Sequence, residues 1–436
     1  MTVSLHDLAT TDQLLLVSDF DGTIAGLSPD AYDVPVNRDS LAALSRLAGL
    51  PNTTVAVLTG RHLAGLARVC ELSDPVVLAG SHGAENSEHG VVLTEEQSTA
   101  LAGVERQLRA ITEQHPPAFV ELKPLQRVVH VAALAEQDPD AAARVLARAA
   151  LVEHPGATMA PGKNIIEFSV STVDKGDWIA AERERRGASA TVFIGDDTTD
   201  ENGFRVLGSA DLGIKVGEGA TAAGMRVADR AAVAAFLAEL AGARARHTGI
   251  PVELGPGFRA IAAGMTAEVL RVHDWDAQTP CEQWVARDII CHLCDWYPRN
   301  LRLAGVELDL RCQAATDPVG AWQELVAKVQ LLLDDPVTAQ AVFADGPDRG
   351  STVGAATKGY FLPDVFMHTW DLARSQGHDV ELDEDYAQRN LHGLESQGEL
   401  LQDGGKFGVP QRTPEGASAG LRLMAHVGRR PDFGLS

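Results

Sequence analysis

The first hundred residues alternate short apolar runs with helical patterns, and this alternation limits the fold more than any other feature of the chain. The apolar runs cover residues 14–20, 53–60 and 76–83, and helical periodicity covers 38–47 and 62–70. Strands that alternate with helices predict a parallel sheet covered by helices on both faces. We therefore expect a doubly wound α/β core at the front of the chain.

This rhythm is interrupted after residue 94 and returns near residue 171. The intervening patterns read helix, strand, strand, helix, strand, which predicts an inserted α+β cap domain. Its expected elements are 94–114, 119–123, 127–134, 139–154 and 164–170. Strand patterns at 191–195 and 212–216, with helices around them, then resume the core. The predicted bounds are 1–97 and 171–245 for the core and 98–170 for the cap.

Strand patterns nearly disappear from the second half of the chain. Gly, Pro and charged residues over 246–256 predict a linker. Four long amphipathic helices follow, and they predict an antiparallel four-helix bundle that occupies residues 257–436. The expected bundle helices are 257–273, 281–303, 317–334 and 361–376, with two more at 384–401 and 417–427. The predicted fold class is thus α/β plus all-α.

Charge and composition exclude several classes of partner. The formal net charge is −23, from 37 basic and 60 acidic residues, which repels nucleic acid and anionic membrane. We find no apolar run long enough to span a bilayer and no signal-peptide pattern. The five cysteines are odd in number and lack scaffold spacing. A reducing, cytoplasmic location is therefore expected.

The segment Asp19-Phe20-Asp21-Gly22-Thr23 directly follows the first apolar run. Two carboxylates separated by one residue at the end of a strand can share a divalent cation while one of them attacks phosphorus. Gly22 lets the backbone pass close to a phosphate, and Thr23 adds a hydroxyl donor. An acidic turn after a strand is the plainer interpretation of any Asp-x-Asp pair. The strand, the glycine and the threonine together favour phosphoryl transfer through an aspartyl-phosphate.

Three further segments are expected to complete this site. Thr59 ends a strand pattern and offers a hydroxyl to a phosphate oxygen, and Lys175 opens a helix with a cation. Asp196, Asp197 and nearby Asp200 end another strand pattern with the oxygen ligands that Mg²⁺ prefers. The carboxyl ends of the strands of an open α/β sheet line one crevice, so these segments should converge.

These four segments resemble the signature motifs of haloacid-dehalogenase-type phosphatases. The resemblance extends to the trehalose-6-phosphate phosphatases over about residues 12–240. It is carried by Gly60-Arg61, His82-Gly83-x-Glu85, Glu121-x-Lys123, His130, Gly162-Lys163-x-x-x-Glu167, Asp174-Lys175-Gly176 and Gly195-Asp196-Asp197-x-Thr199-Asp200-Glu201.

The resemblance implies a role for each matching residue. It makes Asp19 the nucleophile and Asp21 the general acid/base. It implies Mg²⁺ held by Asp19, the Asp21 backbone carbonyl and Asp196, with supporting Asp197 and Asp200, and it puts Thr59 and Lys175 on the phosphate. The residues implied to bind the sugar phosphate are Gly60, Arg61, His82, Lys123, Arg127, Lys163, Glu167 and Glu201.

One position departs from the family pattern. An arginine commonly stands two residues after the histidine that corresponds to His130, and here Ala132 occupies that place. The loss of a cap cation does not affect the phosphate chemistry, but it leaves the identity of the sugar undetermined. The expected substrate is trehalose 6-phosphate, and another glycosyl phosphate is the alternative.

In the helical half, Asp364 and His368 stand one helical turn apart on the same face. An imidazole from a facing helix, such as His292, would complete a three-ligand site for Zn²⁺ or another first-row metal. Such spacing also arises by chance, so by itself it favours a hydrogen-bonded core histidine. Cys291 and Cys294 are interpreted as small core residues.

A second resemblance concerns this half of the chain. Trp284-x-x-Arg287-Asp288-x-x-x-His292 and His368-Thr369-Trp370-Asp371 resemble the DinB-type, mycothiol-dependent maleylpyruvate isomerase superfamily over about residues 255–435. The resemblance implies a metal at His292, Asp364 and His368, where other members often carry Glu in place of Asp364. It also implies a low-molecular-weight thiol as a partner. The alternative is a non-catalytic module that binds a thiol or partner and regulates the phosphatase.

Overall fold

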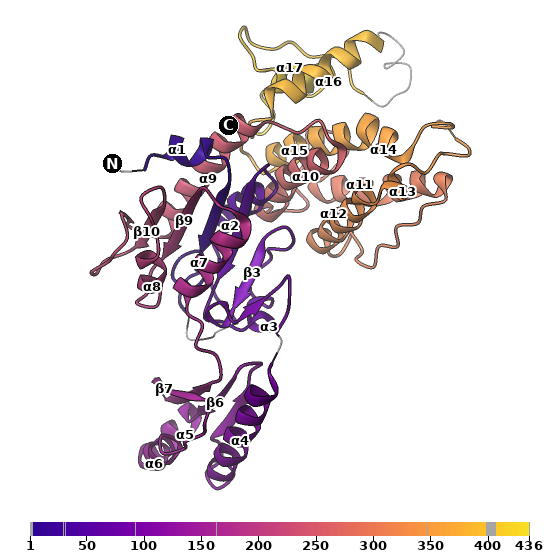
Figure 1. The fold of residues 1–436 in the computed structure, drawn as a ribbon. Coiled ribbons are helices and arrows are strands. Elements are labelled where there is room, and N and C mark those ends of the chain that lie inside the picture. The colour runs from indigo at the N-terminus through magenta and orange to yellow at the C-terminus, as the bar shows by residue number, and fades with distance from the viewer. Residues whose placement is uncertain are drawn as a thin grey trace.

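A computed structural model describes residues 3–435 except 29, 31, 92, 163, 347 and 398–406. Figure 1 shows a sheet-containing core in the middle, a smaller cap on one side of it, and a helical part on the other. The core combines segments from both sides of the cap in the sequence. None of the described helices is both long and apolar enough to cross a membrane.

The core is built on a seven-stranded sheet with the order β11-β10-β9-β1-β2-β3-β4. Neighbouring strands are parallel except β3 and β4, which are antiparallel. The strands are β1 (Leu14–Ser18), β2 (Thr53–Leu58), β3 (Val77–Gly80), β4 (Glu85–Asn86), β9 (Ala190–Gly195), β10 (Leu212–Val216) and β11 (Met225–Val227). The expected parallel-sheet core is therefore confirmed.

Alternate residues of each strand face two different helical layers. On β1, Leu14 and Leu16 pack toward one layer, whereas Leu15 and Val17 pack toward the other. The first layer contains α1 (Leu5–Thr10), α2 (Arg38–Ala48), α3 (Leu63–Leu66) and α9 (Arg230–Thr248). The second contains α7 (Lys175–Arg186) and α8 (Asp200–Arg205). A short 3₁₀ helix, η1 (Ser81–Gly83), follows β3.

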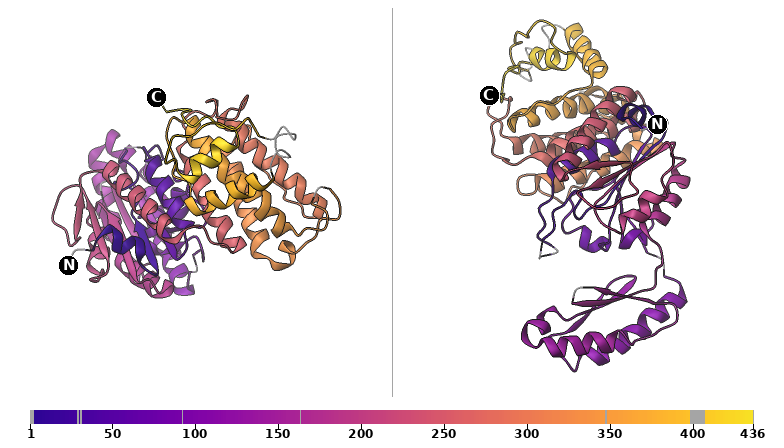
Figure 2. Two further views of the ribbon diagram at one scale, coloured as in Figure 1. Left: turned by 90° about the horizontal axis from the view of Figure 1, so that it is seen from above. Right: turned by 90° about the vertical axis from the view of Figure 1, so that its left-hand side faces the viewer.

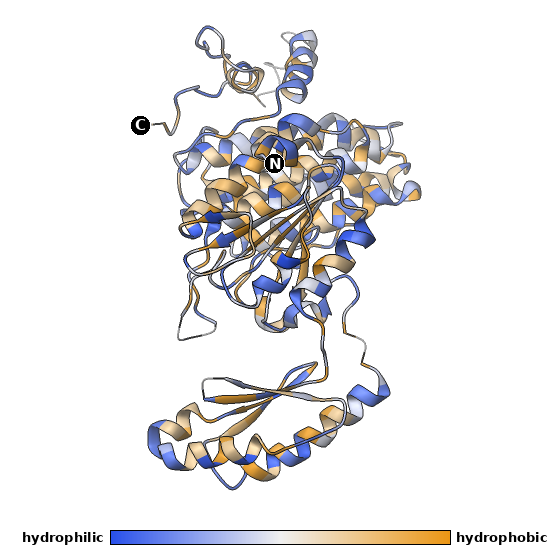
Figure 3. Cartoon of the chain, turned by 60° about the vertical axis from the view of Figure 1, so that its left-hand side comes forward, coloured by the Kyte–Doolittle hydropathy of each residue, from blue (hydrophilic) through white to orange (hydrophobic). Residues whose placement is uncertain are grey.

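The cap is a four-stranded antiparallel sheet, in the order β5-β6-β8-β7, with helices on one face. The other face of the sheet is turned toward the core (Figures 2 and 3). Its elements are α4 (Glu95–Thr112), β5 (Phe119–Leu122), β6 (Gln126–His130), α5 (Ala132–Gln137), α6 (Pro139–Ala149), β7 (Thr158–Gly162) and β8 (Ile165–Ser169).

Two details of the cap differ from the sequence prediction. The strand expected over 127–134 ends at His130, and Ala132 begins a helix instead. The strand β7 was not predicted because all five of its residues are exposed, so it carries no apolar alternation.

The second half of the chain is helical, as expected. Its four long helices share one apolar core, in which Trp322 and Trp370 are buried. They are α10 (Leu254–Arg271), α11 (Ala286–Leu301), α12 (Pro318–Asp334) and α15 (Leu362–Ser375). The other elements are η2 (Arg302–Ala304), α13 (Pro336–Ala339), α14 (Val353–Ala356), the π-helix η3 (Thr357–Phe361), α16 (Glu384–Gln397), which is as long as α15, and α17 (Ala419–His426). The end of the helix predicted over 384–401 lies outside the described residues.

The helical half packs directly on the core through α10 and α2 (Figures 1 and 2). The Arg38 guanidinium donates to the Leu270 carbonyl at 3.0 Å, and Arg271 pairs with Asp39 at 3.0 Å. The chain between α9 and α10 is shorter than the linker predicted over 246–256, because α9 continues to Thr248 and α10 begins at Leu254. The two halves therefore meet along a long helix pair.

Candidate functional site

The carboxyl end of β1 carries Asp19, which is 5% exposed. The Lys175 ammonium, at the start of α7, donates to Asp19 Oδ1 at 2.6 Å and to Asp200 Oδ1 at 2.7 Å. The Asp19 backbone N–H donates to the Ile194 carbonyl at 2.8 Å, which ties the end of β1 to β9. Segments 156 and 25 residues distant from Lys175 thus meet at one buried cation. The ends of β1 and β9 and the start of α7 thus come together, as predicted.

Asp19, Asp196 and Asp200 form a cluster whose carboxylate oxygens lie within 4.8 Å of one another. Asp200 is fully buried, and its Oδ2 accepts the backbone N–H groups of Asp196 and Asp197 at 2.9 and 2.8 Å. Because Asp200 also pairs with Lys175, both of its oxygens are engaged. Asp19 and Asp196 are therefore the members best able to share a cation, as oxygen ligands suit Mg²⁺.

Asp197 does not join this cluster. Its side chain is exposed and accepts the Thr198 backbone N–H at 2.6 Å. Lys215, which is buried on β10, donates to the Asp196 backbone carbonyl and holds the loop from the other side. Lys215 was not identified from the sequence. A lysine in an otherwise apolar, fully buried strand was a signal that could have identified it.

Gly22 and Thr23 line the floor between the two strand ends. The Thr23 hydroxyl lies 3.3 Å from Asp19 Oδ2 and 3.5 Å from Asp196 Oδ1. Gly22 has a φ of +84°, and a Cβ there would lie 2.0 Å from Asp196 Oδ2. Only glycine combines a positive φ with the absence of a Cβ that would clash with Asp196, so glycine is required at this position for steric reasons.

Asp21 faces Arg61 rather than the carboxylate cluster. The Arg61 Nε and Nη2 atoms donate to the two Asp21 oxygens, each at 2.6 Å. The buried Thr59 hydroxyl accepts the Arg61 backbone N–H at 3.2 Å. The Arg61 guanidinium also lies 5.7 Å from the centre of the Phe20 ring. The Asp21 carboxylate is thus held by a bidentate pair at the side of the site.

Burial shifts the charge state of this cluster. Desolvation, followed by repulsion from Asp200 and Asp196, raises the pKa of Asp19 to about 7, although Lys175 acts in the opposite direction. The pKa of Asp196 is also raised, by burial and then by Asp200 and Asp197. Burial lowers the pKa of Lys175, but Asp19 and Asp200 outweigh it and raise the net value. Carboxylates crowded in this way favour a bound cation or a shared proton.

His82 closes the site on the side of β3. Its imidazole covers Gly60, where a Cβ would lie 2.8 Å from His82 Cε1. Burial lowers the pKa of His82, and the cations Lys175 and, more weakly, Lys123 of the cap add to this shift. The cap lysine is therefore within electrostatic reach of the core site. Glu201, in contrast, accepts the Ala222 backbone N–H at 2.8 Å and ties down a neighbouring loop.

The face of the cap sheet that is turned toward the core carries a cluster of polar side chains. Glu121 Oε2 lies 2.9 Å from His130 Nε2 and 3.9 Å from Lys123 Nζ. The Gln126 amide donates to Glu167 Oε1 at 2.9 Å. These residues alternate along β5, β6 and β8, so they share one face.

The same face carries an exposed aromatic pair. The Phe119 and His130 rings stack at 4.8 Å with an angle of 8° between them, and Phe119 is 54% exposed. Gln126 and Phe119 were not identified from the sequence, because neither residue type marks a site without its neighbours. The helix side of the sheet holds Arg127, whose Nε pairs with Glu105 of α4 at 3.0 Å. The Arg127 side chain thus lies on the opposite face from the side chains of Lys123 and Glu167, although its Nη1 donates to the Lys123 backbone carbonyl at 2.8 Å. Lys163 lies outside the described residues.

A second cluster lies between α11 and α15 in the helical half. One ligand atom each from His292, Asp364 and His368 lies within 4.8 Å of the others. Asp364 Oδ2 contacts His292 Nε2 at 3.0 Å and accepts the Trp296 indole N–H at 2.9 Å. Asp364 Oδ1 lies 3.4 Å from His368 Nε2. Burial lowers the pKa of His368, but Asp364 and Asp371 raise the net value well above the ordinary one.

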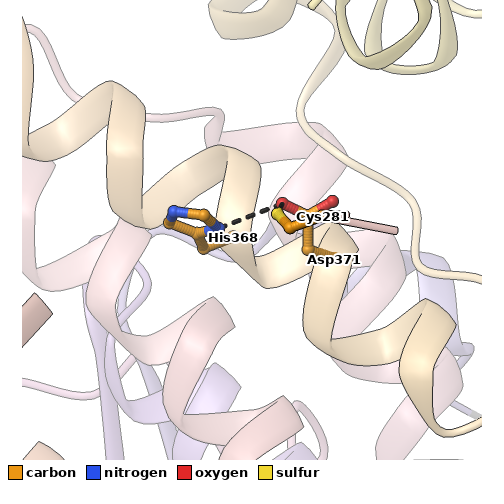
Figure 4. Close-up of side chains that lie close together, drawn as sticks. All are labelled: Cys281, His368 and Asp371. Carbon is orange, nitrogen blue, oxygen red and sulfur yellow. Dashed lines mark hydrogen bonds and ion pairs between the residues drawn. The ribbon is translucent and has the colours of Figure 1, made fainter. Parts of the chain in front are cut away.

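The other ring nitrogen of His368 faces a second carboxylate, Asp371 (Figure 4). Asp371 Oδ2 lies 3.0 Å from His368 Nδ1 and 3.2 Å from Cys281 Sγ. The Arg429 guanidinium lies 3.1 Å from the same Asp371 oxygen and 2.9 Å from the sulfur. A cation already occupies this side of His368, so Cys281 and Asp371 orient the imidazole and do not form a separate metal site.

The core and its site have the layout of a haloacid-dehalogenase-type phosphatase: a parallel sheet, a lysine-paired aspartate at the end of β1, and an inserted cap. Comparisons with known proteins agree. The trehalose-phosphatase family model matches residues 17–229. Trehalose-6-phosphate phosphatase of Escherichia coli (strain K12) is 32% identical over 217 residues, which are 48% of this chain and 80% of that protein.

Two further proteins are similar to about half of the chain. Trehalose-phosphate phosphatase of Mycobacterium ulcerans is 30% identical over 239 residues, which are 51% of this chain and 60% of that protein. A solved structure, described as a trehalose-6-phosphate phosphatase related protein, is 26% identical, with a TM-score of 0.41, and the match covers 52% of this chain and 97% of that one.

The chain belongs to the trehalose-phosphatase family. It is therefore a phosphoric monoester hydrolase, and phosphatases of this type generally use Mg²⁺. The family match ends at residue 229, so α10 to α17 lie outside it.

Proposed function

We propose that the α/β core and its cap hydrolyse trehalose 6-phosphate to trehalose and inorganic phosphate. The observation that carries this proposal is the buried pair of Lys175 and Asp19 at 2.6 Å, with Asp196 beside it. The family membership and the polar face of the cap support the sugar phosphate as substrate. Another glycosyl phosphate is the alternative, because Ala132 replaces a cation that the family commonly carries in the cap.

Asp19 acts as the nucleophile. Its carboxylate attacks phosphorus, the bond to the sugar oxygen breaks, and an aspartyl-phosphate forms on Asp19. Lys175 offsets part of the negative charge that gathers between the two anions. Water then attacks the phosphorus of this intermediate and releases phosphate, which restores Asp19.

Asp21 moves the protons in both steps. It protonates the departing sugar oxygen in the first step and removes a proton from the attacking water in the second. Arg61 sets the position of the Asp21 carboxylate through its two N–H donors. Thr59 and Thr23 offer hydroxyl groups to the phosphate at the floor of the site.

The residues fit a magnesium ion, because three carboxylates crowd together and burial raises the pKa of both Asp19 and Asp196. Asp19, Asp196 and the Asp21 backbone carbonyl would hold it, with Asp200 ordering the loop. When bound, Mg²⁺ reduces the repulsion between the phosphate and the carboxylates.

The cap supplies the sugar contacts. We assign this role to Glu121, Lys123, Glu167 and the Phe119–His130 stack, because they share the face that is turned toward the core. Arg127 is left out, because its guanidinium pairs with Glu105 on the opposite side.

Phosphate release from a panel of sugar phosphates, with Mg²⁺ present, tests this assignment. We expect trehalose 6-phosphate to have the highest kcat/KM, and Asp19→Asn to abolish turnover while circular dichroism is unchanged. Preference for a different glycosyl phosphate would change the proposed substrate but would leave the proposed mechanism unchanged. Absence of turnover with every sugar phosphate would reject the proposal.

We further propose that α10, α11, α12 and α15 form a DinB-type four-helix bundle that binds a divalent metal at His292, Asp364 and His368. The carboxylate at His368 Nδ1 supports this, since metal-bound histidines commonly donate their other N–H to such a group. The donor set suits Zn²⁺ or a similar first-row ion.

Metal analysis of the full-length chain tests the second site. Wild-type protein should retain about one additional first-row ion, and His368→Ala should lose it while phosphate release is unchanged. A wild-type chain without such an ion would reject the metal site. A change in phosphatase kinetics in His368→Ala would instead favour the regulatory interpretation of the helical half.

A further inference from the structure

We propose that the junction between the core and the helical half binds a small organic anion with an apolar body. The site is a cavity of about 260 Å³ bounded by α2, α10, α15 and the segment that leads into α16. None of the residues assigned to the phosphatase site or to the metal cluster lines it. This ligand site is therefore separate from both.

The apolar part of the cavity wall comes from both halves of the chain, and seven charged residues line the cavity beside it. Leu50 follows α2, Ile261 belongs to α10, Phe366 belongs to α15, and Leu382 precedes α16. All four side chains are buried to at least nine-tenths. A cavity of this size is slightly below the usual range of about 300–1,000 Å³ for ligand pockets, so its apolar part suits the hydrocarbon body of a small ligand.

One cation in the cavity, Arg46, has no partner among the described residues. Arg46, in the last turn of α2, lines the cavity and is partly buried. Among the described residues, its guanidinium makes neither a hydrogen bond nor an ion pair. Burial lowers the pKa of Arg46, although Glu268 and Glu381 oppose the shift. A guanidinium shielded from water without acceptors loses hydrogen bonds that a carboxylate or phosphate would restore.

Glu268 and Glu381, the two acidic residues that act most strongly on the pKa of Arg46, already have other partners. Glu268 is 3% exposed, and its oxygens contact His378 Nε2 at 2.6 Å and Arg271 Nη1 at 3.3 Å. Glu381 pairs with Arg246 at 2.9 Å at the exposed edge of the cavity. Neither carboxylate therefore satisfies Arg46.

The remaining acidic residues of the lining are engaged or solvated. Asp383 accepts the Tyr386 backbone N–H at 2.7 Å, and Glu384 accepts the Ala419 backbone N–H at 2.8 Å. Asp385 is exposed to solvent. These hydrogen bonds leave the carboxylate charges in place, so the cavity offers a ligand one guanidinium without a described partner, Arg46, beside five acidic residues. The complement of that guanidinium is one anionic group attached to an apolar body.

A ligand in this cavity would contact both the core and the helical half of the chain. Arg46 and Leu50 belong to the core, whereas Phe366 and Thr369 flank His368 on α15. A bound anion would therefore bridge the phosphatase core and the helix that carries the metal cluster.

Calorimetric titration of the full-length chain with cinnamate tests this proposal. Cinnamate carries one carboxylate on a flat apolar body, and cinnamyl alcohol has the same body without the charge. We expect one saturable cinnamate site per chain and affinity for the alcohol lower by about tenfold or more. Equal affinity for the two compounds, or absence of saturable binding, would overturn the proposal.

Two variants locate the site within the chain. Arg46→Gln removes the cation, and Gly264→Leu fills the cavity, because a Cβ at Gly264 meets no atom within 4 Å. Each should weaken cinnamate binding by about tenfold or more. Arg246→Gln is the matched control, because Arg246 also lines the cavity but already pairs with Glu381. Cinnamate binding that is unchanged in folded Gly264→Leu protein would contradict the assignment.

Discussion

The carboxylates around Asp19 differ in their hydrogen-bond partners, which supports the different roles proposed for them. Asp200 gives one oxygen to Lys175 and the other to two backbone N–H groups, so it orders a loop. Asp21 gives both oxygens to Arg61. Asp19 and Asp196 keep oxygens that face each other across Gly22. Identical side chains thus take separate roles within one small volume.

Gly22 is the residue on which this spacing depends. In Gly22→Ala, the new methyl group would lie 2.0 Å from Asp196 Oδ2, at a φ of +84° that L-residues rarely adopt. Displacement of Asp196 should lower kcat/KM by about 100-fold or more. Steady-state phosphate release with trehalose 6-phosphate measures this effect.

Gly217→Ala is the matched control for Gly22→Ala. Gly217 has a φ of +74°, but a Cβ there meets no atom within 4 Å. It should lower the free energy of unfolding by about 1–2 kcal/mol through backbone strain and leave kcat/KM unchanged. Equal losses of activity in the two variants would show that strain, rather than contact with Asp196, explains the need for glycine.

At the scale of single elements, β5 separates two functions by strand alternation. Phe119 and Glu121 point to the face that is turned toward the core, whereas Val120 packs on the cap helices. On α15 the helical period places Asp364, His368 and Asp371 on one face, because they follow one another at spacings of four and three residues.

Phe119→Ala should weaken sugar binding without changing the phosphate chemistry. Loss of the stacked ring should raise KM for the sugar phosphate about 3- to 10-fold. Turnover of p-nitrophenyl phosphate, which lacks a sugar, should stay the same. Leu122→Ala is the control, because Leu122 is 49% exposed but on the other face of β5. A similar rise in KM in both variants would remove Phe119 from the sugar site.

Asp371→Asn tests the element that orients His368. The substitution weakens the acceptor at His368 Nδ1, so affinity for Zn²⁺ should fall by about 10- to 100-fold in a competition assay with a chelator. Cys291→Ser should leave it unchanged, because Cys291 is not among the residues that form either histidine cluster. Unaltered Zn²⁺ affinity in Asp371→Asn, with a lower unfolding midpoint, would limit Asp371 to a stabilising role.

At the scale of the whole molecule, close packing of α2 against α10 sets how the two halves are arranged. A Cβ on Gly49 would lie 2.1 Å from the Ala263 Cβ and 2.9 Å from the Arg259 carbonyl, so the helices approach closely only because this side chain is absent. Leu270 of α10 packs within the apolar core of the α/β layer. The helical half thus packs directly and closely on the phosphatase core.

Gly49→Leu should separate this helix pair. Overpacking of a tight interface costs about 1–3 kcal/mol, so the midpoint of denaturant unfolding should fall, together with affinity for the anion at the adjoining cavity. Gly224→Leu, where a Cβ meets no atom within 4 Å, should change neither quantity. A wild-type midpoint in Gly49→Leu would mean that the contact between α2 and α10 contributes little to stability.

Local patterns in the sequence were sufficient for the parallel core, for the helical second half and for the meeting of Asp19, Lys175 and Asp196. Each of these rests on short-range rules: period-two burial, helical period, and the common edge at which parallel strands end. Such rules also failed where their signal was weak, as in the exposed strand β7 and in Ala132, which begins a helix.

The amino-acid sequence by itself determined which chemical groups stand at the strand ends and along one face of α15. Only the tertiary structure decided which partner each group takes: Arg61 with Asp21, Arg127 with Glu105, Asp371 with Arg429, and Arg46 with no described partner. The physical reason is that these pairings depend on surfaces brought together across long stretches of chain, and local periodicity carries no information about such contacts.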